Sequence, residues 1–339
     1  MKALVLNGPE DMQVIEKPKP QPGPGEALIK VGFCGICGSD LHAYKAGMFP
    51  YGMTVGHEYA GIIESVGPGV TEWCPGQRVT GTASLACHDC RPCRDGQDNI
   101  CKAMNVIGVT RDGAMADYLL VPEESLCEIP SGMPLEYGAL VEPLSVAVHA
   151  INKVEATAEE IAVVVGAGTV GLFVLAELKR QGLNKVIVLE VNPARAAVAC
   201  QMGADVVLNP LRDNVDDHLY RLTDGAGADL VFECVGLPDT IRDAGNLSRQ
   251  GGTVLILGIC EIPVEIFFLG LVTREIQLRT SYGATAEEFR RALCILAEGG
   301  IDLKPIISRI VSLEEIRDSG FDSLLEKSCP DVKVLVKIQ

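Results

Sequence analysis

The chain has little positive charge and no long hydrophobic run. Its 339 residues include 29 lysines and arginines against 45 aspartates and glutamates, a formal net charge of −16. A nucleic-acid partner favours a basic face, so we expect none. The longest uncharged run, 161–176, is shorter than a membrane span and contains three glycines of a turn, so no membrane partner is expected. Residues 1–9 predict a first strand rather than a signal peptide, and we expect a cytoplasmic protein.

The length and the patterning predict two domains of the α/β class. Residues 1–148 contain short apolar or alternating runs between Pro/Gly clusters, which is typical of a compact barrel-like or sandwich-like β domain. Residues 149–284 alternate strands with helices and predict a doubly wound parallel sheet. Its predicted strands are 161–165, 185–189, 204–208, 229–234, 253–258 and 276–281. The tail, 285–339, with a predicted helix at 287–299 and a strand at 331–338, is expected to return to the first domain.

Cysteine is abundant. Thirteen cysteines without a secretion signal favour metal ligation and buried thiols over disulfides. Four of them form the clearest motif, Cys87-x2-Cys90-x2-Cys93-x7-Cys101. Four thiolates on one short lobe can close a tetrahedron around zinc, the arrangement of a structural site. A ferredoxin-type iron–sulfur cluster needs its last cysteine closer, and a cysteine-rich surface loop formed by chance is the other alternative.

A second group of potential metal ligands lies between residues 34 and 58. Cys37, His57 and Glu58 offer a thiol, an imidazole and a carboxylate, and zinc takes all three. Ser39 and His42 supply a hydroxyl and an imidazole, the parts of a proton-transfer chain. The alternatives are that Ser39 caps a helix and that the cysteine and histidines are ordinary core residues.

A glycine-rich turn follows the apolar strand at 161–165. It reads G-x-G-x-x-G from Gly166 through Gly168 and Val170 to Gly171, and a predicted helix follows at 172–181. In this setting the glycines let a pyrophosphate approach the helix N-terminus. Glu190 stands nineteen residues after the last glycine, where a carboxylate can bind the adenosine ribose hydroxyls. These features predict NAD; Arg195 could instead receive the 2′-phosphate of NADP. Plain turn glycines are the alternative.

Together these motifs resemble those of the zinc-containing medium-chain dehydrogenase/reductase superfamily, the group of alcohol, sorbitol, butanediol and threonine dehydrogenases. The resemblance covers essentially the whole chain and implies a GroES-like catalytic domain followed by a Rossmann domain. Five motifs stand in family order: 37–42, 56–58, the four-cysteine lobe, Gly138-Ala139-Leu140-Val141-Glu142-Pro143 and the glycine fingerprint. Taken alone, Glu142 before a proline could simply belong to a helix start.

The resemblance also implies residue roles. Cys37 and His57 would bind a catalytic zinc, with either Glu58 or Glu142 as the carboxylate ligand, and the four-cysteine lobe would bind a second, structural zinc. Ser39 would touch the substrate oxygen, and His42 would be the outer member of the proton relay. Asp40 would orient the histidine ligand.

The resulting expectation is a zinc-dependent oxidoreductase that transfers hydride between NAD and a secondary alcohol, a short vicinal diol or a polyol. Oxidation of an amino alcohol, as in threonine dehydrogenases, shares every motif; a non-catalytic cofactor-binding protein is the other alternative. Sorbitol dehydrogenases carry an arginine where this chain has Ser281, beside Tyr282, so we expect a short diol to outperform sorbitol. Arg279 shares the strand face of Ser281. A homo-oligomer, dimer or tetramer, is the family expectation.

Overall fold

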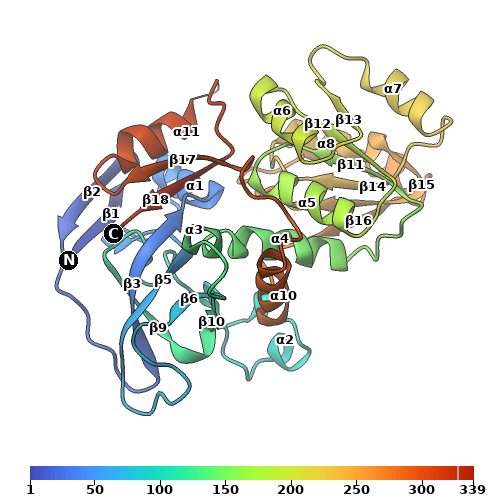
Figure 1. Cartoon of the computed structure of the whole chain (residues 1–339). Coiled ribbons are helices and arrows are strands. Elements are labelled where there is room, and N and C mark those ends of the chain that lie inside the picture. The colour runs from blue at the N-terminus through green and yellow to red at the C-terminus, as the bar shows by residue number, and fades with distance from the viewer. Residues whose placement is uncertain (327) are drawn as a thin grey trace. The chain divides into compact units, whose positions relative to one another are not determined.

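The computed structural model describes residues 1–326 and 328–339 and divides into two compact units (Figure 1). The first unit comprises 1–145, 284–300 and 307–339, and the second comprises 146–283 and 301–306. The first division therefore falls after Ser145, three residues before the predicted boundary at 148. The short segment 301–306, within the predicted C-terminal return, belongs to the second unit.

The first unit is built on mainly antiparallel sheet. Its largest sheet runs in the order β10-β6-β5-β3-β18-β17, with β9 also paired to β3. These strands are β3 (Glu26–Gly35), β5 (Glu58–Val66), β6 (Arg78–Gly81), β9 (Tyr118–Pro122), β10 (Leu126–Glu128), β17 (Ile307–Ser312) and β18 (Lys333–Lys337). A smaller sheet joins β2 (Asp11–Glu16), β1 (Lys2–Gly8) and β4 (Met53–Thr54), and β7 (Ser84–Leu85) pairs with β8 (Asn105–Val106). Among the described strands of this unit, only the pairing of β17 with β18 is parallel. The C-terminal strand β18 thus lies beside β3, and side chains such as Ile29, Val31 and Val334 form a common core.

Most helices of this unit are short. They are α1 (Gly38–Ala46), α2 (Arg91–Arg94), α3 (Leu135–Gly138), α4 (Val141–Asn152), α10 (Ala286–Ala297) and α11 (Ser323–Leu325), with single turns at Asp98–Ile100 and Glu123–Ser125 and a π-helix at Ile316–Asp322. Helix α4 begins in this unit and continues into the second unit after Ser145. Helix α10 begins at a capping box in which Thr285 and Glu288 each bind the other's backbone. Its residues Phe289, Leu293 and Leu296 recur at helical spacing and are buried, so α10 has one apolar face.

The second unit is a six-stranded sheet in which every pairing is parallel, in the order β13-β12-β11-β14-β15-β16. The strands are β11 (Ile161–Val165), β12 (Lys185–Leu189), β13 (Val206–Leu208), β14 (Ala228–Glu233), β15 (Ser248–Ile256) and β16 (Gln277–Thr280). The connecting helices are α5 (Thr169–Arg180), α6 (Pro193–Gln201), α7 (Val215–Leu222), α8 (Pro238–Leu247) and α9 (Phe268–Val272). This order is that of a doubly wound nucleotide-binding sheet, so the predicted α/β class is confirmed.

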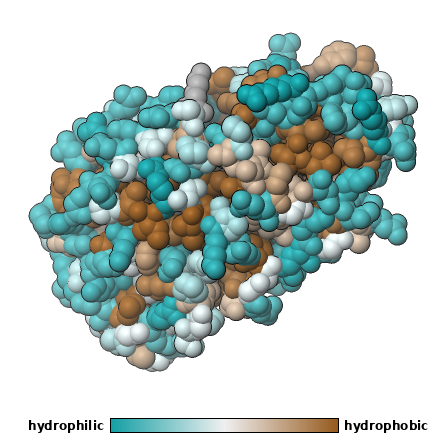
Figure 2. All heavy atoms as spheres, turned by 45° about the horizontal axis from the view of Figure 1, so that its top comes forward, coloured by the Kyte–Doolittle hydropathy of each residue, from teal (hydrophilic) through white to brown (hydrophobic). Residues whose placement is uncertain are grey.

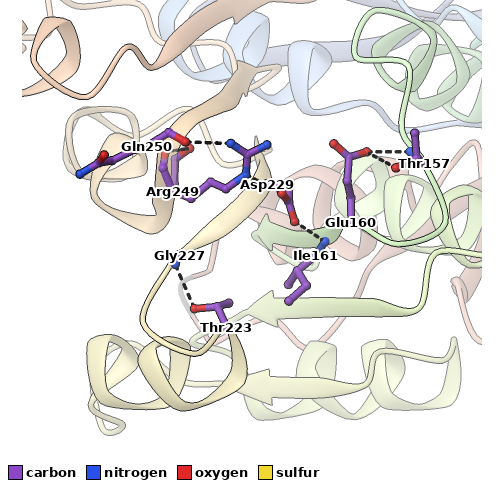
Figure 3. Close-up of polar contacts among 9 residues, drawn as sticks. Thr157, Glu160, Ile161, Thr223, Gly227, Asp229, Arg249 and Gln250 are labelled. Carbon is purple, nitrogen blue, oxygen red and sulfur yellow. Dashed lines mark hydrogen bonds and ion pairs between the residues drawn. The ribbon is translucent and has the colours of Figure 1, made fainter.

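Polar contacts fasten the amino ends of the central strands (Figure 3). Asp229, near the start of β14, accepts a hydrogen bond from Ile161 N at 2.8 Å and pairs with Arg249 of β15 at 2.6 Å. Thr223 accepts from Gly227 N at 2.9 Å just before β14 begins. These contacts fix the amino ends of the strands. The glycine fingerprint lies at their opposite, carboxyl ends. Within the described part of the chain, no helix is long and apolar enough to cross a membrane.

Candidate functional site

The first candidate metal centre starts at the N-terminus of helix α1. Cys37 is the N-cap residue, and Asp40, in the first turn, accepts a hydrogen bond from Cys37 N at 3.0 Å. A carboxylate here satisfies a free backbone N–H and complements the helix dipole. Ser39 lies inside the helix, so the alternative that Ser39 is the N-cap is wrong. The cap fixes the position of the Cys37 thiol.

Three potential ligands come together at this point. One ligand atom each from Cys37, His57 and Glu58 lies within 4.8 Å of the others, and His57 and Glu58 are buried. His57 Nδ1 faces Asp40 Oδ1 at 3.7 Å, and neither atom has a hydrogen-bond partner among the described residues. The arrangement places Asp40 beside Nδ1 and leaves Nε2 as the imidazole nitrogen for a metal.

The charges in this cluster are strongly coupled. Burial opposes the protonated imidazole, but the negative charges of Asp40 and Cys37 outweigh it and raise the pKa of His57 well above its ordinary value. Burial also raises the pKa of Asp40. A bound cation would relieve this concentration of negative charge, and its binding would release a proton from His57.

Glu142, Ser39 and His42 do not belong to this group of three potential ligands. Glu142 is in the first turn of α4, and loss of water around its carboxyl raises its pKa to about 7. Its charge acts on His57, yet it does not belong to the group whose ligand atoms lie within 4.8 Å of one another. Ser39 and His42 are three residues apart on α1, both partly exposed, so they share a helix face.

Sequence analysis missed Lys333, which lies in β18. Its ammonium donates to both carboxylate oxygens of Glu58, each at 2.8 Å, and only 2% of its side chain is exposed. Burial lowers the pKa of Lys333, but attraction to Glu58 exceeds that penalty and the pKa is raised. One signal was present in the sequence: a lysine inside the apolar run 332–336 requires a buried partner.

The four cysteines of the lobe also converge. The Sγ atom of Cys90 lies 3.4 Å from that of Cys93 and 3.8 Å from that of Cys101. Four Zn–S bonds of about 2.3 Å in a tetrahedron require sulfur atoms about 3.8 Å apart, so the lobe fits zinc. Backbone amides of Lys102 and Cys93 directed at its sulfur lower the pKa of Cys90 to about 6, which favours the thiolate form that a metal needs. The donor set at Cys37, His57 and Glu58 is likewise one that zinc accepts.

The three glycines of the fingerprint differ in their local surroundings. Gly166 has φ 95°, in the left-handed region that favours glycine. A Cβ atom on Gly171 would lie 1.9 Å from Gly166 O, so this glycine allows close packing of α5 on β11. A Cβ atom on Gly168 would meet nothing within 4 Å, so the turn is open there and its backbone is accessible. Val170 lies in the first turn of α5.

Glu190 stands at the carboxyl end of β12 beside this turn. Its Oε2 accepts from Ala167 N and its Oε1 from Asn192 N, each at 2.7 Å. The carboxylate is therefore held in place and keeps lone pairs for ribose hydroxyls. Arg195 lies in the first turn of α6. Glu190 also borders an open hollow of about 380 Å³, whose further lining includes Asn209 and Arg212. No local motif indicated these last two residues.

Comparison with known proteins agrees with this geometry. The family model described as alcohol dehydrogenase GroES-like domain matches residues 23–131, and that described as zinc-binding dehydrogenase matches 169–298. An L-threonine 3-dehydrogenase of Rhizobium rhizogenes is 31% identical over 330 residues, 96% of this chain and 95% of the relative.

Solved structures are equally similar over the whole chain. The crystal structure of 2R,3R-butanediol dehydrogenase from Bacillus subtilis is 30% identical, has a TM-score of 0.92, and the match covers 100% of this chain and 99% of that one. A structure from Sinorhizobium meliloti 1021, described as a zinc-binding dehydrogenase bound to NADP, is 33% identical with a TM-score of 0.92, covering 99% and 98%. The chain therefore belongs to the zinc-containing medium-chain dehydrogenases/reductases and is an oxidoreductase of that family.

Proposed function

We propose that this protein transfers hydride between a secondary alcohol and NAD, with a small vicinal diol as the preferred type of substrate. The observation that carries the proposal is the convergence of Cys37, His57 and Glu58 within 4.8 Å, next to the carboxylate of Asp40. We further propose that Cys37 and His57 hold a zinc ion with a carboxylate, and that the four-cysteine lobe holds another. Zinc bound there supplies a Lewis acid for the substrate oxygen.

The chain's own residues handle the proton of the alcohol. Oxidation removes a hydride from carbon and a proton from the hydroxyl, and the proton needs a path to solvent. Ser39 would accept it from the substrate hydroxyl and pass it to His42, which lies three residues later on α1 and is partly exposed. Asp40 orients the His57 imidazole through its Nδ1 side.

The substrate preference rests on the region after β16. Ser281 stands where sorbitol dehydrogenases carry an arginine, and its Oγ is buried without a hydrogen-bond partner among the described residues. Arg279 does not replace that arginine, because its guanidinium donates to Lys153 O and to Gln277. A long polyol therefore loses one anchor, whereas a short diol needs only the metal, Ser39 and one carboxylate.

We expect 2,3-butanediol to exceed sorbitol in kcat/KM by about tenfold or more, because sorbitol lacks a charge-assisted hydrogen bond at Ser281. Steady-state NADH formation with both substrates measures this ratio. In Ser281→Arg the ratio of kcat/KM for 2,3-butanediol to that for sorbitol should fall. Ser248→Arg is not a suitable control, because Ser248 is buried in β15. Ser84→Arg, in the first unit, is the better control. A sorbitol kcat/KM above that of every short diol would contradict the proposal.

A second candidate substrate is L-threonine. The observation that favours it is the set of curated relatives, which are L-threonine 3-dehydrogenases at 31–32% identity over 96% of this chain. The same assay with L-threonine distinguishes the two. Threonine oxidation faster than that of any uncharged diol would assign the protein to amino-alcohol oxidation.

For the cofactor, we expect NAD to be preferred over NADP because the Glu190 carboxylate would repel a 2′-phosphate. Glu190→Gln keeps the size of the side chain and removes its charge, so the NAD/NADP ratio of kcat/KM should fall by about tenfold or more. Arg195→Ala and Arg212→Ala test whether either arginine binds the 2′-phosphate of NADP. This test matters because one similar solved structure is described as bound to NADP. Equal efficiency of the wild-type protein with both cofactors would refute the Glu190 argument.

We also propose a homo-oligomer. The edge strand β16 pairs with β15, and all four of its residues are exposed. The preceding helix α9 and its N-cap residue expose apolar side chains: Phe267, Phe268, Leu269 and Val272 are 60–75% exposed. The face in Figure 2 shows apolar patches within a mostly hydrophilic surface. Two copies of β16 could pair antiparallel across a twofold axis and cover this edge in both chains. Sedimentation equilibrium of the intact protein tests for a dimer or a larger assembly.

A further inference from the structure

A fully buried carboxylate lies at the carboxyl end of strand β14 in the second unit. Glu233 is the last residue of β14 and is 0% exposed. Its Oε1 lies 3.0 Å from Val235 N, 2.9 Å from Gly236 N and 2.7 Å from Thr240 Oγ1, and Gly236 N is also 3.2 Å from Oε2. The Glu233 side chain is the acceptor in each of these contacts. It therefore joins the loop after β14 to the first turn of α8.

The same residue also fixes the loop that follows β15. Its backbone carbonyl oxygen accepts hydrogen bonds from Leu257 N at 2.8 Å and from Gly258 N at 3.0 Å. A Cβ atom on Gly258 would lie 2.5 Å from Glu233 Oε2 and 2.1 Å from Gly236 N. The two loops therefore pack backbone against backbone, and the Glu233 carboxylate lies at their contact.

These two loops lie beside the glycine fingerprint, where the order of the sheet reverses. Glu233 is the register partner of Val165 in β11, which directly precedes Gly166. A Cβ atom on Gly166 would lie 2.6 Å from Val235 Cγ2. The strands run outward from β11 to β13 on one side and from β14 to β16 on the other, so the fingerprint and Glu190 belong to one mononucleotide-binding half and the two loops to the second.

The two loops expose apolar side chains at this edge of the sheet. Val235, Leu237 and Ile259 are 40%, 57% and 46% exposed. Apolar side chains at the carboxyl ends of parallel strands suit the flat ring and the ribose of a bound nucleotide. Their placement depends on the backbone of the loops, and that backbone is held by Glu233.

We propose that Glu233 is a positioning residue that holds the loops after β14 and β15 in the conformation that binds the nicotinamide half of the dinucleotide. Because Glu233 is fully buried, it acts through these loops and not on the substrate. The inference rests on the function proposed above, because it assumes a nicotinamide dinucleotide on this sheet. Without the carboxylate, the loops would adopt the binding conformation only part of the time, and the apparent affinity would fall by that fraction.

The test compares the whole dinucleotide with a fragment that occupies only the first half. Isothermal titration calorimetry gives the dissociation constants of NADH and of AMP for the intact wild-type protein, Glu233→Met and Glu233→Gln, with NADPH in place of NADH if the wild type prefers it. We expect Glu233→Met to weaken NADH binding by about tenfold or more and AMP binding by less than about twofold. Glu233→Gln keeps an oxygen for Val235 N and Gly236 N, so it should recover most of the NADH affinity.

Glu177→Met is the matched control. Glu177 is also a fully buried glutamate of this unit, but it lies on α5 and pairs with Arg180. Its loss should lower stability without changing the ratio of the two dissociation constants. If Glu233→Met does not fold, Thr240→Val removes a single donor and should weaken NADH binding by about threefold or more with AMP binding unchanged.

Equal weakening of NADH and AMP binding in Glu233→Met would indicate a general loss of structure and overturn the proposal. Unchanged NADH binding would also overturn it, as would a Glu233→Gln variant as weak as Glu233→Met, because hydrogen bonding would then not be the cause. If the wild-type protein binds neither NADH nor NADPH, the proposed function fails and not this inference alone.

Discussion

Replacing Cys37 by alanine is expected to lower kcat/KM by about a thousandfold or more and to remove one zinc ion per chain, while the fold persists. The thiol is held at the N-cap of α1 and points into the group formed with His57 and Glu58. Losing a metal that stabilises charge on a reacting oxygen removes several kcal/mol of transition-state stabilisation, and about 4 kcal/mol corresponds to a thousandfold. Elemental analysis, circular dichroism and steady-state kinetics measure the three parts of this prediction.

Cys34→Ala is the matched control. Cys34 lies three residues earlier in β3, is fully buried and directs its sulfur at Gly35 O, 3.6 Å away, outside the ligand group. Its removal should cost some stability through a small cavity but leave the zinc content unchanged. Full metal content and near-normal activity in Cys37→Ala would show that the ligands have been assigned to the wrong residues.

Local patterns in the sequence were sufficient for most of the nucleotide-binding sheet. The apolar runs at 161–165 and 185–189 match β11 and β12 at both ends, because a strand buried on both faces is apolar throughout. The prediction for β15 was less accurate: the strand begins at Ser248, five residues before the predicted start at 253. Gly251 and Gly252 lie within β15, and the register of β15 with β14 shifts between Ala228 and Leu230.

The ion pair of Lys333 with Glu58 could not be predicted in the same way. The two residues are 275 positions apart, and they meet only because β18 returns to β3 and because Gly35 lies between them. The sequence predicted a strand at 331–338, which contains Lys333. It did not predict the register in which β5, β3 and β18 pair.

The four-cysteine lobe makes a long-range contact with helix α10, and this contact should contribute to stability. Asp98, between Cys93 and Cys101, accepts a hydrogen bond at 3.3 Å from Ala286 N, the first residue of helix α10. A carboxylate at this position satisfies a backbone donor and complements the helix dipole. The lobe is therefore attached to the C-terminal part of the first unit. Loss of order in the lobe should also destabilise residues outside it.

Cys93→Ala is expected to abolish zinc binding in the lobe and to lower the unfolding midpoint by about 10 °C, because zinc binding at such a site contributes several kcal/mol of folding free energy. Three remaining thiolates cannot complete the tetrahedron, and loosening of the lobe would withdraw Asp98 from α10. Elemental analysis and differential scanning calorimetry measure both effects. Cys74→Ala, which removes an exposed thiol outside the lobe, should change neither. Unlike Cys37→Ala, the lobe variant should keep the zinc at Cys37 and retain activity below its lowered midpoint; an unchanged metal content and midpoint would exclude a structural zinc in the lobe.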